Sequence, residues 1–241
     1  MLVELLGLPG SGKSTLVKTL LESSADLPFH VETLNQRAER VLQHHATKRG
    51  YIRRKMGRGW FFATFEFAHS YPEIFRIVFE NAILQQDRNL DFFDLMAQYH
   101  FSKQATDTVG PAITDEGFLH RGSAIFLYPN AYSSIDCYLQ HVPSFDTVIH
   151  VECPIDLAIE RCKSRPKGVP KRYRNFSDQE LSQSYQKLMQ LHQICLDHHK
   201  NRGGNIIRVD GQRPWAQTAQ IILDILNENG AKGSVPYDVK A

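Results

Sequence analysis

The beginning of the chain contains residue types that bind phosphate groups. Glycines at three positions allow backbone angles denied to other residues, so that amide N–H groups can approach phosphate oxygens closely. A lysine supplies a positive charge for the β- and γ-phosphates, and a serine hydroxyl is a suitable ligand for Mg²⁺. This pattern, G-x-x-x-x-G-K-[ST], is formed by Gly7, Leu8, Pro9, Gly10, Ser11, Gly12, Lys13 and Ser14. Thr15 can add a hydrogen bond to the α-phosphate. From the whole loop we predict a site for ATP with Mg²⁺.

Two carboxylates follow a short apolar segment in the middle of the chain. Asp115 and Glu116 come directly after residues 111–114, which we expect to form a strand, and Gly117 allows a sharp turn after them. Carboxylates at the end of a parallel strand point into the crevice where such sheets bind ligands. We predict that Asp115 holds Mg²⁺ together with Ser14, and Glu116 is a candidate base for the proton of an attacking hydroxyl. An acidic turn in which Asp115 caps a helix stays open as the alternative.

A third candidate carboxylate is Glu32, at the end of the apolar residues 29–31. It could face the acceptor substrate, or it could be a helix-capping or solvated acid, and the residues favour neither interpretation.

Positive charge is concentrated in two stretches, although the chain has 28 Lys and Arg against 26 Asp and Glu and a net charge of only +2. In the stretch from 161 to 174, Arg161 and Arg165 are four residues apart and are expected to stack on one helix face. Residues 166–170 contain two prolines and a glycine and are typical of a flexible flap. Guanidinium groups closing over a phosphoryl group stabilise its transition state. A solvated basic surface is the alternative.

The other basic stretch, residues 48–58, follows two histidines and precedes a run of aromatic residues. It would suit an anionic acceptor or a nucleic-acid backbone, and a solvated helix face is equally compatible with it, so we assign no contact there. Helical spacing favours a core role for the aromatic residues. The small net charge gives no argument for a generic nucleic-acid binder.

Short apolar segments alternate with helical patterns along the chain, which indicates an α/β protein with a buried parallel sheet flanked by helices. Residues 35–107 show helical periodicity and are predicted to be a helical insertion between the second and third strands. We expect a single domain over residues 1–229 and a C-terminal tail over residues 230–241. The expected strands cover residues 2–6, 29–31, 111–114, 147–151 and 205–209.

The remaining composition indicates a cytoplasmic protein that does not enter a membrane. The four cysteines form no C-x-x-C pair, which favours reduced thiols over disulfides or a zinc site. No targeting segment or membrane-length apolar run is visible. The sequence gives no indication of the oligomeric state.

Taken together, these motifs resemble those of the P-loop nucleoside and nucleotide kinase superfamily, whose thymidylate-kinase-like and adenylate-kinase-like members are small kinases. The resemblance is carried by residues 7–15, by Asp115-Glu116-Gly117, by residues 154–165 with their paired arginines, and by residues 209–214. It implies a P-loop NTPase fold with a five-stranded parallel sheet in the order 2-3-1-4-5. It also implies phosphoryl transfer from ATP, an acceptor-binding insertion, a lid over residues 161–175, and contact of the segment containing Arg213 with the adenine.

The chain departs from the superfamily where the acceptor would bind. Thymidylate kinases carry arginine after the strand-three aspartate, whereas Glu116 stands here and Arg121 follows several residues later. Deoxynucleoside kinases follow the strand-two acid with proline, whereas Glu32 is followed by Thr33. A hydroxyl acceptor with a carboxylate base is therefore at least as plausible as a nucleotide, and Glu32 and Arg121 are the candidate acceptor residues.

The leading hypothesis is an ATP-dependent small-molecule kinase with a small, polar or anionic acceptor. Its predicted catalytic residues are Lys13, Asp115, Glu116, Arg161 and Arg165, and Arg161 and Arg213 are expected to contact the nucleotide. A regulatory or nucleic-acid-associated ATPase is the alternative. A GTPase is disfavoured because the chain has no N-K-x-D base-reading motif.

Overall fold

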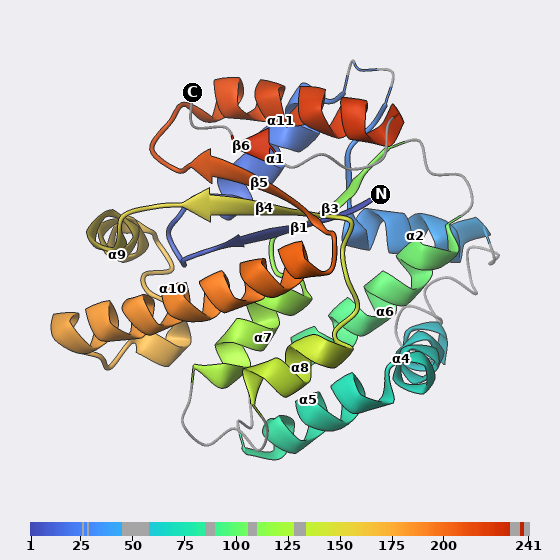
Figure 1. Cartoon of the computed structure of the whole chain (residues 1–241), viewed down its shortest axis with the longest axis horizontal. Helices are drawn as coiled ribbons and strands as arrows, with labels where there is room; N and C mark the ends of the chain where they lie inside the picture. Colours follow the sequence, from blue (N-terminus) through green and yellow to red (C-terminus); the bar gives the residue numbers. More distant parts are fainter. Residues whose placement is uncertain are drawn as a thin grey trace.

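The structure is a computed structural model that describes residues 1–25, 27, 29–44, 58–84, 90–105, 110–127, 134–231 and 237–238. A parallel sheet lies in the middle of the molecule, with helices on both of its faces (Figure 1).

Six strands in the described residues form one sheet in the order β2-β3-β1-β4-β5-β6, and every pair is parallel. The first five confirm the predicted order 2-3-1-4-5. The sixth, β6, lies in the segment predicted to be only a tail and pairs with β5 at the sheet edge. The strands are β1 (Leu2–Gly7), β2 (Glu32–Thr33), β3 (Ala112–Thr114), β4 (Thr147–Glu152), β5 (Asn205–Asp210) and β6 (Tyr237–Asp238).

The second strand begins later than predicted. Residues 29–31 are not part of β2, because Val31 donates its backbone N–H to the Ser24 hydroxyl and His30 packs against Gly110. Pairing with β3 starts only at Glu32, whose N–H donates to the carbonyl of Pro111. The strand is therefore Glu32–Thr33, and Glu32 begins it instead of following it.

Helices make up most of the rest of the described chain. Long helices such as α10 have clear start signals, since Ser177 and Glu180 form a reciprocal capping box at its N-terminus. The helices are α1 (Lys13–Ser23), α2 (Leu34–His44), α4 (Arg58–Ser70), α5 (Pro72–Leu84), α6 (Leu90–Gln104), α7 (Phe118–Phe126), α8 (Ile135–His141), α9 (Ile155–Ser164), α10 (Asp178–Asn201) and α11 (Trp215–Ala231), with a 3-10 turn η1 (Lys171–Tyr173).

The two faces of the sheet bury separate hydrophobic clusters. One face packs against α1 and α11, and the other packs against α7, α10 and the helices α2, α4, α5 and α6 that connect β2 to β3 (Figure 1). The insertion is thus helical where the structure describes it, as predicted. The central strand β1 is buried along its whole length, which agrees with its nearly continuous apolar sequence.

The aromatic residues of the insertion divide between core and surface. Phe67 is buried and stacks on Phe118 of α7, as the core interpretation predicts. Phe61, Phe62 and Phe65 on α4 are instead more than half exposed, so that prediction is wrong for them. All four cysteines are free thiols. In the part of the chain that the structure describes, no helix is long and apolar enough to cross a membrane.

Candidate active site

A cavity of about 1070 Å³ opens at the carboxyl ends of β1 and β3. Its walls come from the glycine loop after β1, the turn after β3, α7, the end of α9, η1 and the start of α11. Because β1 lies between β3 and β4, the strand order reverses beside it, and such reversals leave a crevice in open α/β sheets. The fold thus gathers residues from distant parts of the sequence around one cavity.

The glycine loop is packed so closely that two of its glycines have no room for a side chain. Gly10 has a φ of +88°, and a Cβ there would lie 2.1 Å from the carbonyl oxygen of Ala158 in α9. Gly12 has a φ of +101°, and a Cβ there would lie 2.2 Å from the Trp215 ring. The loop is therefore held between α9 and α11 in a conformation that only glycine adopts without strain.

Lys13 begins α1 and turns back onto the loop that precedes it. Its Nζ donates to the carbonyl oxygens of Gly7, at 2.7 Å, and Leu8, at 3.0 Å. Burial lowers the pKa of Lys13 to about 8, although Asp115 and Glu116 partly oppose the shift. The ammonium group thus lies against the loop and close enough to the two carboxylates to interact with their charges.

Ser14 and Asp115 meet at the edge of the cavity, although 101 residues separate them in the sequence. The Ser14 hydroxyl donates to Oδ2 of Asp115 at 2.6 Å. Both side chains offer hard oxygen ligands beside the loop, which is the donor set that Mg²⁺ prefers when phosphate oxygens complete its coordination. The two residues present therefore fit a nucleotide-bound Mg²⁺.

Glu116 and Arg121, which the sequence analysis names separately as candidate site residues, form an ion pair at the cavity. Arg121 donates from Nη2 to Oε2 of Glu116 at 2.9 Å and from Nε to the Glu116 carbonyl at 3.1 Å. The carboxylate is about half exposed and lines the cavity. Arg121 thus holds Glu116 in one orientation.

The turn that carries both carboxylates is anchored from below by Glu4 of β1. This carboxylate is fully buried and accepts a hydrogen bond from the N–H of His120 at 2.8 Å. Burial raises its pKa to about 7, while the N–H groups of Phe118, Leu119 and His120 act in the opposite direction. Gly117 leaves room for it, because a Cβ there would lie 2.3 Å from Cδ of Glu4. Glu4 therefore takes the place of a local cap for α7, whose N-cap Gly117 has no side chain.

The predicted arginines reach the cavity in a different way from the one expected. Arg161 lies on α9 and donates to the carbonyl of Gly211 at 2.9 Å. Arg165 is not on the same helix face, because α9 ends at Ser164 and Arg165 is its extended C-cap. Pro166 explains this end, since proline disfavours a helical conformation in the residue before it. Both side chains nevertheless line the cavity.

Two predicted substrate or nucleotide residues do not line the cavity. Arg213 lies in the turn between β5 and α11. Glu32 binds Arg37 at 2.6 Å and Arg40 at 2.8 Å, and Arg37 is itself buried and donates to the carbonyl of Met1. These arginines lower the pKa of Glu32 against the opposing effect of burial. The structure thus places Glu32 in a structural ion-pair cluster.

Replacing Glu32 by glutamine should therefore reduce stability. We expect a loss of about 3 kcal/mol in the free energy of unfolding, because Arg37 would keep its buried charge without a carboxylate partner. Urea denaturation would measure the change, with Glu73→Gln as the control in the exposed pair with Arg76, where we expect less than about 0.5 kcal/mol. An unchanged stability for Glu32→Gln would show that the cluster is not structural.

Several cavity residues were not predicted from the sequence. His120 of α7 lines the cavity, as do Phe92 of α6 and Trp215 of α11. His120 follows the Asp-Glu-Gly turn by three residues, and this short spacing could have indicated that it lies near the cavity. Trp215 gave no such indication, because only the folded chain brings it against Gly12. Most of the basic stretch 48–58 lies outside the described residues.

Sequence comparison matches this chain to no protein-family model and to no curated protein. Solved structures are more informative. A deoxyadenosine kinase from M. mycoides with bound dATP aligns with 94% of this chain and 100% of its own, at a TM-score of 0.50 and 17% identity. This chain has the P-loop kinase fold. A shikimate kinase from Acinetobacter baumannii in complex with shikimate aligns with 96% of this chain and 95% of its own, at a TM-score of 0.42 and 16% identity.

The P-loop kinase fold accounts for the place of the cavity. In this fold the glycine loop and α1 follow the central strand, so the helix N-terminus and the loop amides face the carboxyl edge of the sheet. The turn after β3 reaches the same edge from the neighbouring strand. The fold predicted from the sequence is thus confirmed, and the role of each cavity residue is left to the chemistry of the site.

Proposed function

We propose that this protein is a kinase that transfers the γ-phosphoryl group of ATP to a small-molecule acceptor in the cytoplasm. The observation that carries the proposal is that one cavity joins the glycine loop, the Ser14–Asp115 pair and the Glu116–Arg121 pair. Such a cavity has a place for a triphosphate, a place for its metal ion and a carboxylate beyond them.

On the donor side, the loop amides and the N-terminus of α1 would bind the phosphates, with Thr15 at the α-phosphate. Lys13 would exchange its contacts with Gly7 and Leu8 for phosphate oxygens, and Arg161 and Arg165 would neutralise the phosphoryl group in transfer. Ser14 and Asp115 would hold Mg²⁺, which supplies further charge neutralisation and orients the phosphates.

On the acceptor side, Glu116 would accept the proton of the attacking hydroxyl. The acceptor oxygen forms a bond to the γ-phosphorus, the bond to the β-phosphate oxygen breaks, and ADP leaves. Arg121 would keep the Glu116 carboxylate in position for this step. We further propose that residues 161–175 form a lid, that the insertion covers the acceptor, and that residues 1–229 form one domain.

Acceptor-dependent release of ADP tests the proposal. Purified protein with ATP and Mg²⁺ would be incubated with nucleosides, nucleotides, sugars and aminoglycosides, and products would be identified by ³¹P NMR. We expect ADP release with at least one acceptor class and its loss in Asp115→Asn. Absence of acceptor-dependent turnover across the panel would count against a kinase, and turnover stimulated by DNA or RNA would favour the ATPase alternative.

Nucleotide affinity should fall as the pH rises above about 8. Below its pKa of about 8, Lys13 is already charged in the free protein, whereas above it binding must recover a proton. We expect the dissociation constant of Mg·ATP to rise by up to about tenfold per pH unit above pH 8. Calorimetry between pH 7 and 9.5 would measure it. In the Lys13→Arg variant the side chain stays charged through this pH range, so its dissociation constant for Mg·ATP should depend less on pH. A pH dependence as steep as that of the wild type would contradict the assignment of the effect to Lys13.

A further inference from the structure

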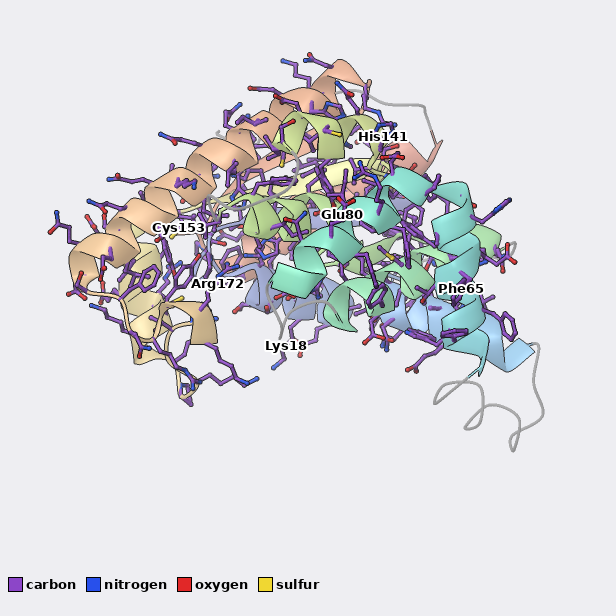
Figure 2. The ribbon with its side chains drawn as sticks, turned by 90° about the horizontal axis from the view of Figure 1, so that it is seen from below. Lys18, Phe65, Glu80, His141, Cys153 and Arg172 are labelled. Atoms are coloured by element: carbon purple, nitrogen blue, oxygen red, sulfur yellow. The ribbon has the colours of Figure 1, made fainter. Side chains whose placement is uncertain are left out.

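Arg172 is a cavity residue to which the proposed donor-side chemistry gives no role. It belongs to η1 and lines the cavity, and its Nε is buried without a hydrogen-bond partner among the described residues. Its guanidinium lies 4.7 Å from the centre of the Tyr173 ring. Figure 2 shows Arg172 on the inner side of η1, toward the middle of the molecule. The side chain as a whole is partly exposed to the cavity, and because its Nε is shielded from water and has no partner, Arg172 is suited to bind an anion there.

Arg165 and Arg172 both line the cavity, but they have different neighbours. Arg165 donates from Nη2 to Sγ of Cys162 at 2.8 Å, and that sulfur lies 3.1 Å from a Cβ built at Gly10, so Arg165 lies beside the glycine loop. The charge of Arg172 is among the causes, after burial, Lys13 and His192, that lower the pKa of His120 in α7, and it also lowers the pKa of His192 in α10. Arg172 therefore lies near the wall that carries His120 and Arg121, where the acceptor would bind, and Arg165 lies near the phosphates.

The charges around the cavity leave a positive excess when ATP is bound. Six cationic side chains and two carboxylates line it, which gives a net formal charge of +4 with neutral histidines. Mg·ATP contributes a charge of about −2, so that about +2 remains on the walls. The eight residues are Lys13, Arg121, Arg161, Arg165, Lys171, Arg172, Asp115 and Glu116.

Among the described residues of the acceptor wall, no other group supplies the missing negative charge. Glu116 is already paired with Arg121. His120 is buried, and burial holds its pKa well below 6.5, so its ring is neutral near pH 7. Phe92 and Ile125 offer apolar surface to the body of a ligand. The counter-charge of Arg172 must therefore come with the acceptor.

We propose that the acceptor is a small hydroxyl-bearing anion, a phosphomonoester or a carboxylic acid, whose negative group binds Arg172 while its hydroxyl faces Glu116. This inference rests on the proposed kinase function and narrows its substrate class. It makes Arg172 a specificity-determining residue for the acceptor.

Binding of simple anions tests the inference without requiring turnover. The protein would be saturated with Mg²⁺ and a non-hydrolysable ATP analogue, which occupies the glycine loop, and titrated calorimetrically with inorganic phosphate and with acetate. We expect at least one anion to bind and Arg172→Gln to weaken it about tenfold or more, whereas Lys200→Gln, at an exposed position near the end of α10 and outside the cavity and the proposed lid, leaves it unchanged. Tighter binding of phosphate assigns a phosphomonoester, and tighter binding of acetate assigns a carboxylic acid. Failure of both anions to bind, or equal binding by Arg172→Gln, overturns the inference.

A kinetic arm separates the inference from the kinase function. Acceptors would be compared in pairs that differ by one anionic group, such as glycerol with glycerol 3-phosphate and thymidine with thymidine 5′-monophosphate. We expect the anionic member to be preferred, and Arg172→Gln to raise its KM about tenfold or more while the KM for ATP stays within about twofold. Equal use of neutral members would overturn the inference and leave a kinase. If none of the tested acceptors were phosphorylated, the result would count against the kinase function. The calorimetric anion titration would still decide whether Arg172 binds an anion.

Discussion

Replacing Lys13 by methionine should lower kcat/KM for phosphoryl transfer by about 10³-fold, which corresponds to about 4 kcal/mol of lost transition-state stabilisation. The ammonium group lies against the glycine loop and interacts with the charges of the two carboxylates, and no other described cation occupies that position. Because Lys13 is partly buried and burial lowers its pKa, methionine removes a partly desolvated charge and keeps a similar volume. The melting temperature should therefore stay constant or rise.

The control for this prediction is Lys18→Met on the exposed side of the same helix. Lys18 forms a solvent-exposed pair with Glu22, so both activity and stability should change little when it is replaced. ADP release and thermal denaturation would be measured on all three proteins. Retention of more than about a tenth of the activity by Lys13→Met would rule out the role assigned to this lysine.

Replacing Gly10 by alanine should cause the largest loss of stability, about 3–5 kcal/mol. The new Cβ would meet the backbone carbonyl of Ala158, which cannot turn aside as a side chain can, and the φ of +88° adds strain. The loop and α9 would have to separate, so nucleotide binding should be lost as well. Chemical denaturation and nucleotide titration would measure the two effects.

Gly203→Ala is a matched control for backbone strain alone. Gly203 has a similar φ of +78°, but nothing lies within 4 Å of a Cβ built there. Its substitution should cost only about 1–2 kcal/mol. If the two alanine variants lose the same stability, close packing between the glycine loop and α9 does not determine the need for glycine at position 10.

The parts of the site that could be predicted from the sequence are those whose elements follow one another directly along the chain. A strand, a glycine loop and a helix follow one another directly around Lys13, so the motif contains its own structural context. Asp115 was found because it ends an apolar segment, and the ends of parallel strands share one edge. The strand order 2-3-1-4-5 came from the family resemblance, which the fold confirms.

The parts that could not be predicted depend on contacts between distant residues. Glu32 was an open candidate for the acceptor because its buried partner Arg37 belongs to the helix that follows, and only packing shows that this arginine is buried. Arg165 was expected on a helix face, but the helix ends one residue earlier. Trp215 lies against Gly12 and lines the cavity, and no local sequence pattern indicates this contact between distant segments.

The contact between Glu4 and Gly117 has a consequence for the divergence of this protein. A carboxylate in the central strand is tolerated only while position 117 has no side chain, and α7 keeps its cap only while position 4 has one long enough to reach it. A change at either position alone should be harmful, whereas a paired change could be neutral. Related sequences should therefore vary at positions 4 and 117 together, and that covariation would mark the chains in which the Asp115-Glu116 turn is supported from the strand beneath it.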